Sequence, residues 1–240
     1  MALSNSFDFT LSRDELIKRS LLMIGAISAG QTPNATDVTD ASQVLNLMLK
    51  AWQADGLQLW QVAVESITPV QGRETYTLGP AGNVSIAGKP PAILEAYRRN
   101  TSTSQDVPLN RISRTQYWEL PDKTQQGIPV SYYWDVQQDV GANDLSVWPT
   151  ADATFAAGDT IEVLYQMPFD DMDAAANNLA FPQEWHLAVA YGLACLLSGE
   201  YGMPLSERRQ LREEAKEEKA RVMDWDQEQT SVFFQPEHRG

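Results

Sequence analysis

The sequence is poor in the residues that build disulfides, metal sites and many catalytic centres. It has one cysteine, Cys195, and two histidines, His186 and His238. A single cysteine forms no disulfide within the chain and fits a reducing compartment. Cys195 lies in an apolar helical stretch and His186 follows Trp185, so we interpret both as residues packed in a core or an interface. We therefore predict no catalytic residue, no metal site and no cofactor, and we do not expect an enzyme.

Motifs that carry common chemistries are also missing. The sequence contains no phosphate-binding glycine loop with its lysine and no G-x-S-x-G nucleophile elbow. Asp170, Asp171 and Asp173 form the densest acidic cluster, but they lack the glycine and the distal glutamate of a calcium loop. A solvated loop is the favoured interpretation. A glycosidase-like pair of carboxylates stays open, because acidic residues are abundant and nothing singles out a pair.

Cations and long apolar runs are scarce as well. Lys and Arg number 18 against 32 Asp and Glu, which gives a net charge of −14. So acidic a surface repels phosphate and disfavours tight binding of nucleic acid. No apolar run approaches the roughly 20 residues of a membrane span, and the N-terminus lacks the pattern of a signal peptide. We expect a soluble protein that makes no contact with a membrane.

The residues that are present favour a folded chain with helices at both ends. Hydrophobic residues make up 43% of the sequence, with seven Trp, seven Phe and eight Tyr, which is enough for a core. Ser12 and Glu15 match a capping box, Thr36 is the expected cap of a second helix, and Pro182 suits the first turn of a third. Apolar residues at helical spacing predict helices over residues 12–29, 36–55, 182–198 and from 204 or 206 to about 224.

Between these helices the apolar period changes to two. Val130, Tyr132, Trp134 and Val136 alternate with polar residues or tyrosine, and similar short runs precede and follow them. This predicts an antiparallel sheet or small sandwich, with one short helix at 113–120. The fold class is α+β: a four-helix unit from both chain ends (residues 1–56 and 182–228), a β insertion (57–181) and an extended C-terminal tail (229–240).

Aromatic residues of the insertion allow an alternative function. Tyr132, Tyr133, Trp134 and Trp148 could stack on a sugar. Strand alternation places Tyr132 and Trp134 on one face and Tyr133 on the other, which favours packing in a core or an interface. The alternative hypothesis is a carbohydrate-binding or cell-wall-degrading module.

The C-terminal tail is apolar where a chain end is normally polar. Val232, Phe233 and Phe234 are consecutive, and Pro236 prevents a helix from continuing. Burial of such side chains contributes about 1.5–3 kcal/mol each, so the tail is expected to pack on its own subunit or, as we favour, on a partner. The predicted partner-binding residues are Thr230, Ser231, Val232, Phe233, Phe234, Gln235, Pro236, Arg239 and Gly240.

Four stretches of the sequence resemble a known family. They are residues 49–60 (LKAWQADGLQLW), 127–135 with 145–150 (GIPVSYYWD and LSVWPT), 163–170 (VLYQMPFD) and 182–186 (PQEWH). Together with the tail after residue 224, they are similar to the head-to-tail adaptors, or tail accessory factors, of short-tailed bacteriophages, the P22-like and T7-like adaptor family. The resemblance spans most of the chain as short matches in a shared order, and it carries no catalytic motif.

This resemblance implies a structural virion protein at the head–tail junction, made in the cytoplasm of the bacterial host. The subunit would belong to a homo-oligomeric ring of twelve copies, with its helical unit against the portal protein and its β insertion towards the tail nozzle protein. Its C-terminal tail would anchor to the portal, and genomic DNA would pass through the lumen without specific binding. An acidic wall suits such a channel because it repels phosphate. A nozzle or tail-completion protein is a further alternative.

Overall fold

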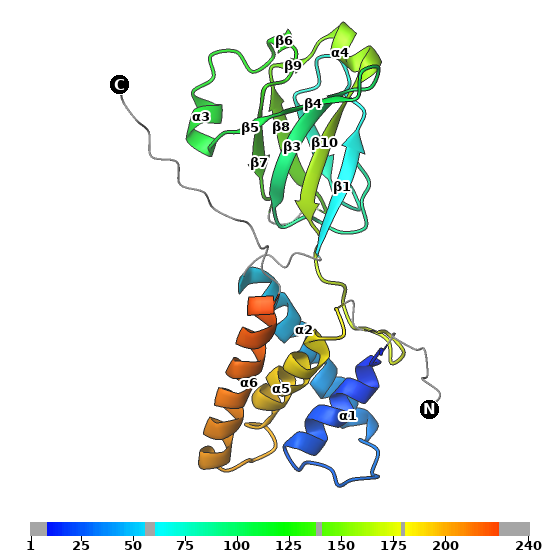
Figure 1. Ribbon diagram of the computed structural model, residues 1–240, viewed down its shortest axis with the longest axis vertical. Helices are drawn as coiled ribbons and strands as arrows, with labels where there is room; N and C mark the ends of the chain where they lie inside the picture. Colours follow the sequence, from blue (N-terminus) through cyan, green and yellow to red (C-terminus); the bar gives the residue numbers. More distant parts are fainter. Residues whose placement is uncertain (1–8, 56–60, 138–140, 179–180, 226–240) are drawn as a thin grey trace, which may run out of the picture. The chain divides into compact units, whose positions relative to one another are not determined.

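The computed structural model describes residues 9–55, 61–137, 141–178 and 181–225 (Figure 1). They confirm the α+β class, and they form two compact units. The helical unit comprises the described residues up to 55 and from 169 onward, and the β unit comprises those from 61 to 168. In the described part of the chain, no helix has the length and apolar character needed to cross a bilayer.

The helical unit packs four helices around one apolar core. These are α1 (Arg13–Met23), α2 (Ala35–Asp55), α5 (Trp185–Leu197) and α6 (Leu205–Trp225). Helix α5 lies between α1 and α6 and also contacts α2 (Figure 1). Fully buried core residues include Leu16, Ile17, Leu21, Leu45 and Leu193.

The starts of these helices are close to those predicted, with two corrections. The capping box is confirmed, since the Ser12 backbone N–H donates to Glu15 Oε2 at 3.0 Å and Glu15 N–H donates to Ser12 Oγ at 3.4 Å. Asn34, not Thr36, caps α2, because its Oδ1 accepts from Asp37 N–H at 2.8 Å. Helix α5 begins at Trp185, and the preceding residues from Pro182 form a turn instead of its first helical turn.

Helix α1 ends earlier than predicted. It stops at Met23, and the chain turns through Gly25 with φ of 70°, a conformation that glycine adopts without strain. Two close contacts then fix α5 in place. The buried Ser20 hydroxyl on α1 lies 3.0 Å from the Ala190 carbonyl of α5. At Gly192 a Cβ would lie 2.8 Å from Trp52 of α2, so only glycine permits this approach.

Residues 169–178, here called the return segment, correct the predicted domain boundary. The sequence placed them with the β insertion, but Phe169 and Met172 are each 3% exposed and pack in the helical core. Side chains of α2 hold the backbone: Gln53 Oε1 accepts from Phe169 N–H at 3.1 Å, and Asn46 Oδ1 accepts from Met172 N–H at 2.8 Å. The segment has neither a helical nor a strand period in its apolar residues. The sequence pattern therefore could not show that it packs with the helical unit.

The β unit is a small sandwich, which decides between the two architectures that the sequence left open. One sheet has the strand order β1-β10-β3-β4 and the other β2-β8-β7-β5, and residues of both form one core. A third, two-stranded sheet pairs β6 with β9. The strands are β1 Val62–Ile67, β2 Thr75–Leu78, β3 Ile93–Asn100, β4 Gln105–Pro108, β5 Asn110–Arg111, β6 Gln126–Gly127, β7 Ser131–Asp135, β8 Asn143–Trp148, β9 Thr150–Ala151 and β10 Asp159–Gln166.

Pairing within the sandwich is mostly antiparallel, as predicted, but not throughout. The short pairs β5–β7 and β6–β9 are parallel. The predicted helix near 113–120 is α3 (Arg114–Trp118), which begins with a capping box at Ser113. A second short helix, α4 (Ala153–Gly158), was not predicted; Asp152 caps it by accepting from Phe155 N–H at 2.8 Å.

The return segment gives a test of the revised boundary. We expect Phe169→Ala to lower the free energy of unfolding of the helical unit by about 3–5 kcal/mol, because it empties a buried aromatic site. Urea denaturation followed by helical circular dichroism measures this change. Phe9→Ala is the matched control: Phe9 is 62% exposed, so its loss is expected to change stability by no more than about 0.5 kcal/mol. Equal effects of the two variants would contradict the assignment.

Candidate interaction surfaces

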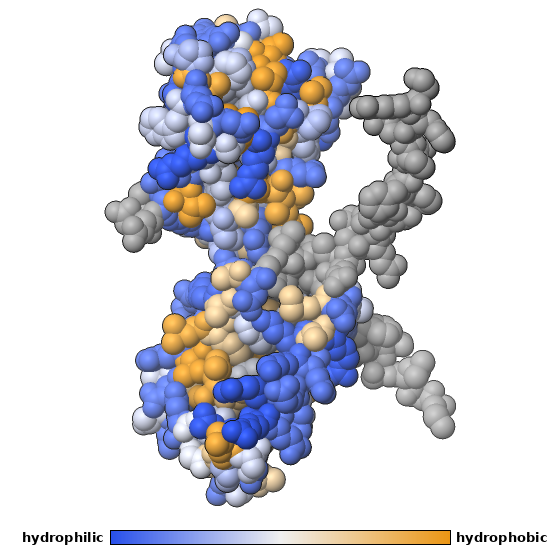
Figure 2. Space-filling view, turned by 90° about the vertical axis from the view of Figure 1, so that its left-hand side faces the viewer, coloured by the Kyte–Doolittle hydropathy of each residue, from blue (hydrophilic) through white to orange (hydrophobic). Residues whose placement is uncertain are grey.

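The predicted tail contacts lie outside the described residues. Residues 230–236, 239 and 240 all fall beyond residue 225, where α6 ends. Their partner-binding role stays a prediction from sequence. Candidate surfaces within the described chain come from its hollows and its exposed apolar side chains, which Figure 2 shows as orange patches on each unit.

An apolar groove of about 440 Å³ opens between α1 and α5. Leu11, Leu16 and Leu22 form the wall on the α1 side, and Leu187 and Ala190 form the wall on α5. Phe9 lies at the groove and is 62% exposed, while Leu187 is 46% exposed. We call this hollow the α1–α5 groove. Apolar side chains left open in this way are typical of surfaces that bind other molecules.

The groove follows from the composition of α5. Trp185, Val189 and Leu193 face the core of the helical unit and are buried, yet Leu187 and Leu196 on other sides of the same helix are exposed. A helix that is apolar all round is normally covered on every side. Here α1, α2 and α6 cover only part of α5, and one uncovered strip becomes the groove wall.

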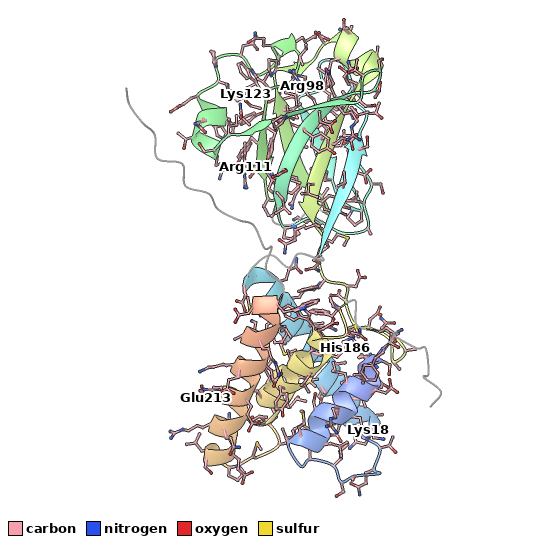
Figure 3. The ribbon with its side chains drawn as sticks, in the orientation of Figure 1. Lys18, Arg98, Arg111, Lys123, His186 and Glu213 are labelled. Atoms are coloured by element: carbon pink, nitrogen blue, oxygen red, sulfur yellow. The ribbon has the colours of Figure 1, made fainter. Side chains whose placement is uncertain are left out.

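The rim of the groove carries two cations, Lys18 and Arg19, and the carboxylate of Glu15. Lys18, which Figure 3 labels on α1, and Arg19 line it. Neither makes an ion pair within the described part of the chain. The nearby carboxylate of Glu15 is engaged by the capping box, where hydrogen bonds from the Ser12 backbone and side chain lower the pKa of Glu15. The groove therefore combines an apolar interior with two available cations.

His186 lies in this groove. Its side chain is 5% exposed, and its ring centroid is 6.0 Å from that of Phe9. Burial lowers the pKa of His186, while the Phe181 backbone and the charge of Glu184 act in the opposite direction. The neutral imidazole is thus the form that suits the folded chain.

The other candidate residues of the helical unit contact their own chain. Asp171 pairs with Lys50 at 2.8 Å, and Asp173 accepts from Asn177 Nδ2 at 2.8 Å. Cys195 is partly exposed on α5. Within the described ranges, no three His, Cys, Asp or Glu side chains are grouped to hold a metal ion.

In the β unit, the aromatic residues considered for sugar stacking are mostly buried. Tyr132 and Trp134 face the sandwich core, as the strand alternation predicted, and are 2% and 7% exposed. Tyr133 points to the other face but is covered, because it stacks on Tyr117 of α3 with ring centroids 4.9 Å apart. Trp148 donates from Nε1 to the Asp122 carbonyl at 2.9 Å. Burial of the three strand β7 rings leaves little of each ring face open for stacking on a sugar.

A second, more polar hollow lies at the edge of strand β7. Arg111 and Arg114 line it together with Tyr133 and Trp134. Both arginines are exposed, and Figure 3 shows Arg111 on the β unit. Polar and apolar side chains share its lining, so it lacks the continuous apolar surface of the α1–α5 groove.

The α1–α5 groove was not predicted from the sequence, although a signal for it was present. Phe9, Leu11 and Leu187 are apolar residues outside the stripes that define the helical core. They are far apart in sequence, and only the packing of α1 on α5 brings them together.

No model of a known protein family matches this chain, and no curated protein matches it.

His186 yields a prediction for pH dependence. Because its pKa in the folded chain is below the ordinary value of 6.5, the unfolded chain takes up this proton first as the pH falls. The folded state therefore loses stability below about pH 6.5, and His186→Gln removes this loss. We expect the melting temperature of the variant to fall less between about pH 7.5 and pH 5 than that of the wild type. Identical slopes in thermal denaturation would contradict the burial of a neutral imidazole.

Proposed function

We propose that this chain is a structural subunit of the adaptor ring that joins the portal to the tail nozzle in a tailed bacteriophage. In this proposal twelve copies surround the channel through which the genome leaves the head. The helical unit meets the portal and the β unit faces the nozzle. The chain has no catalytic role, and it works by assembling with its partners.

The observation that carries the proposal is where the family-like stretches lie in the fold. Residues 49–55 end α2, 163–170 run from strand β10 into the return segment, and 182–186 open α5. Together with Phe181, which directly precedes the last of these stretches, their aromatic residues form a connected series of rings. Trp52 and Trp185 have centroids 6.2 Å apart, Trp185 and Phe181 6.0 Å, and Phe181 and Phe169 4.6 Å.

This placement turns separate short matches into one structural feature. The matching stretches supply three of the four rings, Trp52, Phe169 and Trp185, that join the end of α2, the return segment and the start of α5 in one core, and Phe181 supplies the fourth. The remaining match, residues 127–135 with 145–150, covers the pairing of strand β7 with β8. A resemblance that includes the packing contacts of a fold supports a shared architecture better than the same residues scattered over a surface.

The charge of the chain also supports a channel subunit. A net charge of −14 makes each copy repel DNA. A ring that DNA must cross quickly benefits from a wall that does not bind phosphate.

The C-terminal residues provide the proposed link to the portal. Fifteen residues follow Trp225, and an extended chain of that length reaches at most about 50 Å. Val232, Phe233 and Phe234 lie about halfway along it. They are therefore within reach of a neighbouring molecule, where burial of three large apolar side chains contributes several kcal/mol, at about 1.5–3 kcal/mol each.

Truncation tests this link. We expect a chain that lacks residues 230–240 to keep the circular dichroism and melting temperature of the full chain, because residues between 16 and 222 already form a buried core in each unit. It is expected to lose co-migration with the portal protein encoded in the same genome. A matched pair, Phe233→Ala/Phe234→Ala against Thr230→Ala/Ser231→Ala, separates apolar contact from chain length. Full portal binding by the truncated chain would contradict the proposed role of residues 230–240 in binding the portal.

Electron microscopy of the chain mixed with portal protein separates the adaptor from a nozzle or tail-completion protein. An adaptor adds a ring of density to the portal. Binding to the tail nozzle with none to the portal would favour the nozzle or tail-completion alternative.

A further inference from the structure

We propose that the α1–α5 groove binds the outer face of α2 from a second copy of the chain, with Leu47 entering the groove. This contact deepens the proposed adaptor function, because it names the surface through which neighbouring subunits of a ring would join. It is argued from the helical unit alone and can be tested without the portal.

One large apolar side chain, Leu47, projects from the outer face of α2. Leu47 is 72% exposed, so it does not fill the groove of its own subunit. Asp40, Gln43, Ala51 and Ala54 are exposed on the same side of the helix, each four or seven residues from Leu47. Two alanines on one side of Leu47 leave room for another helix to approach closely.

Charge complementarity favours a second copy as the occupant. The groove rim carries Lys18 and Arg19 without ion-pair partners in the described chain. The first turns of α2 carry Asp37 and Asp40, and Asp40 likewise has no ion pair there. The Tyr201 hydroxyl donates to Asp37 Oδ1 at 3.1 Å, so one oxygen of that carboxylate already has a hydrogen-bond partner in its own subunit. One subunit thus has basic residues beside its groove and acidic residues beside Leu47, so the two surfaces are complementary in charge as well as in shape.

The spacings of the two surfaces also agree. Asp40 precedes Leu47 by seven residues, or about 10 Å along a helix. Glu15 and Leu22, which line the groove on α1, are separated by the same seven residues. Lys18 and Arg19 lie between these two residues, about 5 Å along the helix from either end, so their long side chains can reach towards Asp40 when Leu47 occupies one end of the groove.

A contact between two different surfaces has a geometric consequence. Each copy offers one groove and one Leu47, so every added copy leaves a free groove at one end and a free α2 face at the other. Such head-to-tail contacts close into rings when the rotation between copies permits it, whereas a two-fold contact stops at a dimer. The contact therefore fits a ring subunit.

Cysteine cross-linking tests the contact on the full chain. In a Cys195→Ser background, Leu47→Cys and Leu187→Cys are combined and treated with a short bismaleimide over a range of protein concentrations. We expect a ladder of covalent oligomers from the double variant. An equimolar mixture of the two single variants is expected to stop at dimers, and each single variant alone is expected to give monomers. Dimers from Leu47→Cys alone would reveal a two-fold contact and overturn the proposal, as would the absence of any Leu47–Leu187 link.

Charge reversal tests the rim. Lys18→Glu/Arg19→Glu in the cross-linking variant is expected to reduce the linked fraction at least about tenfold, because like charges then meet across the contact. Asp37→Lys/Asp40→Lys is expected to restore it. Arg209→Glu/Arg212→Glu on α6 changes the net charge equally and is the matched control, since both residues are exposed and without ion pairs in the described chain. Equal losses from both pairs would overturn the role of the rim.

Two further readouts distinguish this contact from binding of the tail in the groove and from binding of the portal. If Phe233→Cys links to Leu187→Cys in place of Leu47→Cys, the tail occupies the groove and the proposal is wrong. Portal binding is scored separately. A ladder without portal binding supports the contact and contradicts the adaptor function, whereas portal binding without a Leu47–Leu187 link does the reverse.

Discussion

The fold of the helical unit depends on the hydrogen bonds that hold the return segment against α2. The backbone at Phe169 and Met172 has no regular secondary structure, yet it is buried, and buried backbone groups require partners. Polar side chains of α2 supply them: Gln53 and Asn46 accept the two N–H groups, and Lys50 donates to the Phe169 carbonyl at 2.5 Å. These bonds let a core continue across a gap of more than a hundred residues in sequence, so that α5 and α6 can pack on α1 and α2.

That fastening also explains why α5 keeps an uncovered side. The return segment and the ring series hold the start of α5 against α2, and Gly192 brings the two helices close. Ser20 fixes α1 on α5 through the Ala190 carbonyl. With α1, α2 and α6 all in place, no fourth neighbour from the described chain remains to cover Leu187. The α1–α5 groove is thus a direct result of how the four helices pack.

Local signals in the sequence were enough for most helices, the main strands and the capping box at Ser12, because each is decided by residues a few positions apart. The capping box of Ser12 and the alternation at Tyr132 and Trp134 are of this kind. The short strands, α4, the cap at Asn34 and the return segment were missed, because non-local contacts or single side chains decide them. The groove was missed for the same reason: its walls come from residues about 170 positions apart, and no periodicity connects them.

Electrostatics then bears on when copies of such a chain could associate. Subunits that each carry a charge of −14 repel one another at a distance, but at physiological ionic strength this repulsion decays over about 8 Å. The proposed contact between the acidic turn of α2 and Lys18 and Arg19 acts only at closer range, where apolar burial of Leu47 adds to it. The long-range repulsion makes the encounter of free subunits slow. The short-range attraction favours contact once two subunits are already side by side. A portal that first captured each tail would place neighbouring copies within that range, so such a template would speed an association that the free chain reaches more slowly.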